Sequence, residues 1–138
     1  IEHCSRLIEQ VVTLRRATLE DTLVTYAIAM QEQLSTPVSR QIAMLIYREG
    51  FGFDDVRTVA RTQFETYQVN PIVGILRDFG YEASDARDIA TQFVAMAFGK
   101  WQRSLLFGEP APDAAETLAH MTAVTRIFLR GIGPVGTD

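Results

Sequence analysis

Cysteines, export signals and long apolar runs are scarce or absent in this sequence of 138 residues. Its one cysteine, Cys4, cannot form an internal disulfide bond, which favours a reducing compartment. No export signal is recognisable, and charges interrupt the apolar runs well below the roughly 18 residues that a membrane-spanning helix needs. We therefore expect a cytoplasmic protein without membrane contacts.

Clusters of basic residues are also scarce. The formal net charge is -4, and Lys/Arg clustering is limited to the short pair Arg15-Arg16. A surface that binds nucleic acid neutralises phosphates with a basic face. These 138 residues by themselves are therefore not expected to bind DNA.

The sequence lacks recognisable motifs for catalysis or cofactor binding. His3 and His120 are far apart and have no helical partner at the spacing of metal ligands. Neither Cys4 nor any serine lies in a nucleophile motif, and no Gly-rich phosphate loop is present. We expect no metal, no cofactor and no enzymatic activity.

Apolar residues and helix signals are what the sequence does contain. Hydrophobic residues make up 47% and charged residues 22% of the chain, enough for one domain that buries roughly two thirds of its unfolded surface. N-cap residues recur before apolar stripes of helical period, and Pro37 occupies the first helical position after Thr36. The expected helix starts are Thr18, Thr36, Asp54, Ser84 and Asp113.

A proline interrupts the third of these helices. The apolar residues before Asn70-Pro71 and those after it lie on faces displaced by roughly a third of a turn. Proline cannot donate the helical hydrogen bond at its position, so we expect a kink or break there. The resulting fold class is all-α, an antiparallel helical bundle, with residues 1–17 as the end of a connecting helix and 18–138 as the domain.

The stretch FVAMAFGKWQRSLLFG, residues 93–108, lies on a helix whose apolar residues cover roughly 200° of its circumference, about twice what one core-facing stripe needs. The last helix has a similar, narrower face. This excess favours a homodimer in which the last two long helices of each subunit form a four-helix interface. The alternative is that both helices are central and covered by the rest of the chain. The residues expected at the interface are Val94, Phe98, Trp101, Leu105, Met121, Val124 and Phe128.

The order of helices, closed by a long hairpin, resembles the C-terminal domain of TetR-family transcriptional regulators. The segment IAMLIYREGFGFDDVRTVARTQFE is similar to one found in a large subgroup, in which a Leu/Ile-rich helix ends in a glutamate, here Glu49. Met44 stands where that subgroup has arginine, and Phe53 where proline is common. The resemblance covers essentially the whole chain.

The resemblance implies a domain that binds a small effector and pairs the subunits. DNA would be read by a helix-turn-helix domain upstream of Ile1, and the usual mode in this family is repression. We therefore expect a repressor released from operator DNA by a small hydrophobic or aromatic ligand. Two other classes stay open: a helical module that binds another protein, and a helical enzyme that uses Glu49.

A ligand pocket inside such a bundle should be mostly apolar with a few orienting polar groups. Gln63 is the most informative candidate, because an amide on an apolar face needs hydrogen-bond partners that a ligand can supply. The alternative for these candidates is ordinary core packing. The candidate ligand-binding residues are Tyr26, Met30, Gln63, Phe64, Tyr67, Phe93 and Met96.

Glu49 falls on the apolar side of its helix, near Leu45 and Ile42. A buried carboxylate requires a compensating cation, so we expect an ion pair with Arg57 or Arg61 on the next helix rather than contact with a ligand.

Overall fold

The computed structural model describes residues 18–133, and this part of the chain contains helices and no strand. The helices are α2 (Leu19–Leu34), α3 (Pro37–Glu49), α4 (Asp54–Phe64), the π-helical turn η1 (Glu65–Val69), α5 (Asn70–Asp78), α6 (Ala83–Phe107) and α7 (Ala114–Ile132). The prediction of an all-α fold is confirmed. The expected connecting helix over residues 1–17 lies outside the described residues.

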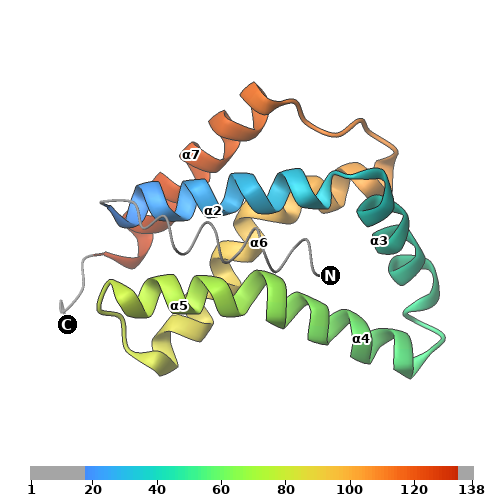
Figure 1. Cartoon of the computed structure of the whole chain (residues 1–138), viewed down its shortest axis with the longest axis horizontal. Coiled ribbons are helices and arrows are strands. Elements are labelled where there is room, and N and C mark those ends of the chain that lie inside the picture. The colour runs from blue at the N-terminus through green and yellow to red at the C-terminus, as the bar shows by residue number, and fades with distance from the viewer. Residues whose placement is uncertain (1–17, 134–138) are drawn as a thin grey trace.

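Two rods of helix span the molecule in Figure 1: α2, and the continuous run of α4, η1 and α5. Helix α3 joins them at one end, and α6 crosses behind them. Helix α2 packs against α7 and α5, and α5 packs against α6. The buried core lies where these four helices meet, whereas α3 and α4 contribute no buried residue to it.

Three of the predicted N-caps are confirmed by their hydrogen bonds. The Thr18 hydroxyl accepts the Asp21 N–H at 3.1 Å, and the Asp113 carboxylate accepts the Glu116 N–H at 2.8 Å. Thr36 caps α3, which begins with proline. Each cap satisfies a backbone donor that the first turn of a helix leaves free.

The predicted cap of α6 is wrong. Helix α6 begins at Ala83 after Glu82, so Ser84 lies inside the first turn, and Glu82 makes no side-chain cap bond. The backbone N–H of Ala86 bonds to the carbonyl of Glu82 at 2.8 Å, which starts the helix without a side-chain cap.

The predicted distortion at Pro71 takes the form of a π-helical turn, η1, directly before α5. In a regular α-helix the N–H of residue 71 would bond to the carbonyl of Tyr67, but proline has no N–H. The Tyr26 hydroxyl, from the buried face of α2, donates a hydrogen bond to that carbonyl. Asn70 accepts a hydrogen bond from Arg87 of α6 at 3.2 Å. The distorted segment is thus tied to two other helices.

Helices α3 and α4 carry apolar side chains that the described part of the chain leaves exposed. Phe51, in the turn between them, is 92% exposed, and Val38 is 66% exposed. The other exposed large apolar residues of this region are Ile42, Met44, Leu45, Phe53 and Val59. We call these seven residues the α3–α4 apolar surface. A concentration of exposed apolar side chains on this scale is typical of an interaction surface.

Glu49 forms a different ion pair from the predicted one. Its carboxylate lies 3.0 Å from the guanidinium of the neighbouring Arg48, and its side chain is 37% exposed. Arg57 instead pairs with Asp54 in the first turn of α4. Because the described residues leave this side chain partly exposed, the carboxylate stays partly in water and needs no buried cation. The predicted pair with Arg57 or Arg61 is wrong.

We predict that Tyr26→Phe destabilises the domain. The substitution keeps the buried ring but leaves the Tyr67 carbonyl without the hydroxyl, and an unsatisfied buried acceptor lowers the free energy of unfolding by about 1–3 kcal/mol. Urea unfolding followed by circular dichroism measures the change. Tyr47→Phe is the matched control, because the half-buried Tyr47 of α3 makes no side-chain hydrogen bond among the described residues. Equal stability of the two variants would contradict the assigned role.

Candidate functional site

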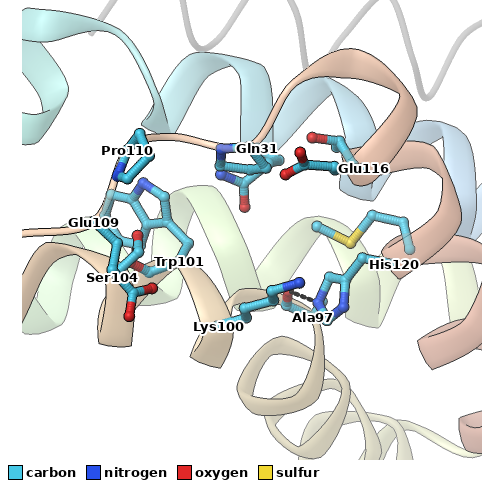
Figure 2. A pocket seen from close by; sticks show the side chains of 12 residues that line it. Gln31, Ala97, Lys100, Trp101, Ser104, Glu109, Pro110, Glu116 and His120 are labelled. Atoms are coloured by element: carbon cyan, nitrogen blue, oxygen red, sulfur yellow. Dashed lines mark hydrogen bonds between the residues drawn. The ribbon is translucent and has the colours of Figure 1, made fainter. Parts of the chain in front are cut away.

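A cavity of about 300 Å³ lies between α2, the hairpin of α6 and α7, and the connection 109–113 (Figure 2). This volume is at the lower end of the range found for small-molecule sites. The lining residues are Gln31 of α2; Ala97, Lys100, Trp101 and Ser104 of α6; Glu109, Pro110 and Pro112 of the connection; and Glu116, Thr117, His120 and Met121 of α7.

Helical spacing brings these side chains to one place. Ala97, Trp101 and Ser104 lie on successive turns of one face of α6, and Thr117 and Met121 do the same on α7. Gly108, with a φ of 68°, then ends α6 in the left-handed conformation. The prolines of the connection cannot continue the helix, so the chain turns across the cavity.

The cavity walls are largely apolar. Trp101 is 6% exposed and Met121 is 1% exposed, and Figure 2 shows the indole on the opposite side of the cavity from His120. Pro110 lies beside the indole in the same view. An apolar molecule would therefore find an indole ring, a thioether and proline rings on its sides.

The indole N–H of Trp101 has no hydrogen-bond partner among the described residues, although the atom is buried. Figure 2 shows this nitrogen on the side of the ring that faces Pro110. Most buried donors in proteins are paired, so an unpaired one marks a place where packing is incomplete or a partner is still to bind.

Two polar side chains on the cavity wall are held by hydrogen bonds. The Gln31 amide nitrogen donates to the Ser35 hydroxyl at 2.9 Å, which leaves its amide oxygen as an acceptor, and Gln31 is 4% exposed. His120 Nε2 lies 3.0 Å from the carbonyl of Ala97. Since a carbonyl only accepts, Nε2 carries the proton in this contact. Both side chains are thereby fixed in orientation.

Two opposite charges lie on opposite sides of the cavity. Figure 2 shows Lys100 reaching in from α6 and Glu116 from α7. Neither side chain forms an ion pair with any of residues 18–133. Lys100 is also the only lysine in the chain. The cavity thus offers an exposed cation and an exposed carboxylate that no described residue neutralises, and Glu109 of the connection adds a second exposed carboxylate to its wall.

The seven predicted ligand residues do not line this cavity. Tyr26, Met30 and Phe93 are buried in the core, where the Phe93 ring packs edge-on against Phe128 with centroids 5.1 Å apart. Phe64 and Tyr67 are partly buried against the same core. Gln63 is half-buried, and Met96 is 37% exposed.

The seven residues predicted at a dimer interface are all buried within the single chain: Val94, Phe98, Trp101, Leu105, Met121, Val124 and Phe128. Helices α2, α5 and α7 cover this side of α6, so the alternative that the helix is central accounts for these side chains. Trp101 and Met121 line the cavity instead. The apolar residues that α6 and α7 leave exposed are Met96, Leu106, Phe107, Leu118 and Ile127.

Several cavity residues were not singled out from the sequence. Gln31 lies one turn after the buried Ala27, so the amide argument made for Gln63 applies with greater force to Gln31. The contributions of Glu116 and Thr117 depend on how α7 packs against α6, which helical period alone does not reveal.

Two features are absent from the described residues. No helix among them is both long enough and apolar enough to cross a membrane. In residues 18–133 no group of three or more His, Cys, Asp or Glu side chains is placed to hold a metal ion.

In comparisons with known proteins, no protein-family model, no curated protein and no solved structure matches the chain. Functional inference therefore depends on the cavity and the exposed surfaces.

We predict that the single tryptophan reports on this cavity. Because Trp101 is 6% exposed, its native emission should be shifted to shorter wavelength relative to the urea-unfolded chain, and acrylamide should quench it severalfold less. Steady-state fluorescence, excited beyond the tyrosine band, measures both. Native and unfolded spectra that coincide would contradict the burial of the indole.

Proposed function

We propose that this chain is the effector-binding and dimerisation domain of a TetR-family transcriptional regulator, a repressor that a small hydrophobic or aromatic molecule releases from DNA. The observation that carries the proposal is the cavity of about 300 Å³ between α2 and the hairpin of α6 and α7. A mostly apolar cavity with a few oriented polar groups is the usual form of a small-molecule site. The helix order and the Leu/Ile-rich helix α3, which ends in Glu49, support the family assignment.

The position of α2 supports a route from ligand to DNA. Gln31 lines the cavity from α2, and α2 begins at Leu19, directly after the segment expected to connect to a DNA-binding domain. A ligand that contacts Gln31 as well as α6 and α7 can favour one placement of α2 over another. Its effect on DNA binding is limited to the difference between its affinities for the two placements.

Dimerisation is proposed through the outer sides of α6 and α7, in place of the buried residues first expected there. Met96 follows the buried Phe93 by three residues, and Ile127, which is 60% exposed, precedes the buried Phe128. Ala95 and Ala123 are exposed nearby in sequence, and small side chains allow two helices to approach closely. A two-fold pair of such hairpins would form a four-helix interface.

The first test is the regulatory function itself. We expect the residues upstream of Ile1 in the full gene product to contain a helix-turn-helix, and the full-length protein to bind its own promoter DNA as a dimer. A ligand that occupies the Trp101 cavity should weaken that binding by roughly 5–150-fold, the usual range of allosteric coupling. Electrophoretic mobility shift at fixed salt measures the effect. A full-length protein without DNA binding would contradict the proposal.

The second test is the oligomeric state of the domain. We expect the 138-residue chain to sediment as a dimer and Ile127→Glu to sediment as a monomer, because a charge at a closely packed helix interface would be buried without a partner. Ile42→Glu, an equivalent change at a 53% exposed position of α3, is the matched control and should remain dimeric. Sedimentation velocity over a concentration series measures both.

A helical protein-interaction module is the second candidate function, and the α3–α4 apolar surface favours it. The module would bind its partner through side chains such as Phe51 and Val38 rather than through a cavity. Sedimentation of the wild type, Ile127→Glu and Ile42→Glu separates the two candidate functions. If the wild type is a monomer, the dimer proposal fails and the interaction module is favoured. If Ile42→Glu and not Ile127→Glu disrupts the dimer, the α3–α4 apolar surface is the subunit interface.

A further inference from the structure

We infer that the cavity binds a small zwitterion with an apolar body, the chemistry of a free apolar α-amino acid. The role of this molecule as an effector rests on the proposed function, whereas its binding follows from the cavity alone. The charges at the cavity wall thereby add to the hydrophobic or aromatic character that the sequence predicts for the ligand.

Two exposed side chains of opposite charge, Lys100 and Glu116, lie at the cavity wall. Lys100 and Glu116 reach toward the cavity from different helices and pair neither with each other nor with another described residue. A ligand with only a carboxylate would pair with Lys100 but lie near Glu116 unfavourably, and an amine would meet the reverse problem. A molecule carrying both charges satisfies both side chains at once.

The buried side chain of Gln31 provides a hydrogen-bond acceptor beside Glu116. The Gln31 amide nitrogen is used by Ser35, so the amide oxygen is the part of this side chain left for a ligand. Figure 2 shows Gln31 and Glu116 next to each other on the side of the cavity opposite Lys100. A ligand ammonium, with three N–H donors, matches a carboxylate and an amide oxygen together. The two polar ends of the ligand are therefore ordered across the cavity.

The volume of the cavity and its remaining walls restrict the body of the ligand. The remaining walls include Trp101, Met121 and Pro110, which offer an indole, a thioether and a proline ring. They also include a second carboxylate, that of the exposed Glu109 on the connection between α6 and α7. A cavity of about 300 Å³ admits a compact molecule rather than a long chain or a polycyclic compound. An apolar side chain on a small zwitterionic head fits both constraints.

The test uses Trp101 fluorescence of the 138-residue chain and three probes that share one phenyl body. Phenylalanine carries both charges, 3-phenylpropanoate lacks the ammonium, and 2-phenylethylamine lacks the carboxylate. We expect phenylalanine to change the emission saturably, with a Kd at least about tenfold lower than that of either relative. Leucine should behave like phenylalanine. The inference is overturned if either single-charge probe binds as tightly as phenylalanine, or if neither amino acid binds.

Two variants test whether Lys100 pairs with the ligand carboxylate and Glu116 with the ligand ammonium. In Lys100→Met, phenylalanine should lose about tenfold in affinity and bind no better than 2-phenylethylamine. In Glu116→Gln, phenylalanine should bind no better than 3-phenylpropanoate. Arg103→Met and Glu32→Gln make the same charge changes on exposed residues of α6 and α2 that do not line the cavity, and both should bind phenylalanine like the wild type. Equal losses in a variant and its control would overturn the assignment.

The outcomes also separate this inference from the proposed function. If amino acids bind as expected but leave DNA binding of the full-length protein unchanged, the ligand class stands and the regulatory role fails. If an uncharged aromatic molecule releases the full-length protein from DNA while the amino acids do not bind, the regulatory role stands and the inferred ligand class is wrong.

Discussion

The absence of one backbone N–H, at Pro71, shapes the whole bundle. It leaves the Tyr67 carbonyl without its helical donor, and the chain accommodates this with the π-helical turn η1 and with the hydroxyl of Tyr26. Because that hydroxyl comes from the buried face of α2, the bond fixes α2 against the distorted rod. The position of α2 in turn determines where Gln31 lies, and Gln31 forms the α2 wall of the cavity.

Much of the fold was predictable because its signals are local. Thr18, Thr36 and Asp113 cap helices through atoms within three residues, and Pro71 acts on the turn before it. Ser84 shows the limit, since a residue with cap chemistry needs the right backbone conformation, and Glu82 holds that position instead. The exposure of α3 and α4 was not predictable, because the sequence pattern of an amphipathic helix is the same whether or not another element covers its apolar side.

The residues that line the cavity were predicted less well than the helices, and for a physical reason. A helical wheel correctly gives the wide apolar arc of α6, but it does not show how much of that arc the same chain covers. Trp101 was expected to face a second subunit and lies in the wall of a cavity, because α2 and α7 close over it. Gln31 was detectable by the argument applied to Gln63, while the opposition of Lys100 and Glu116 arises only when two helices pack.

The lack of buried residues in α3 and α4 also bears on how the molecule opens and closes. Local stability increases with buried apolar contacts. Helices α3 and α4, which we call the α3–α4 arm, should therefore unfold locally as one unit whose amide hydrogens are poorly protected from exchange. Helices α2, α5, α6 and α7 should unfold only with the whole domain. Amide hydrogens from Val38 to Phe64 would then exchange with solvent through openings that leave the core intact. Arg40 of α3 donates a hydrogen bond to the Glu109 carbonyl at 3.4 Å, which links the α3–α4 arm to the connection 109–113. Local opening of the arm would therefore also loosen this connection, which lines the cavity together with Trp101.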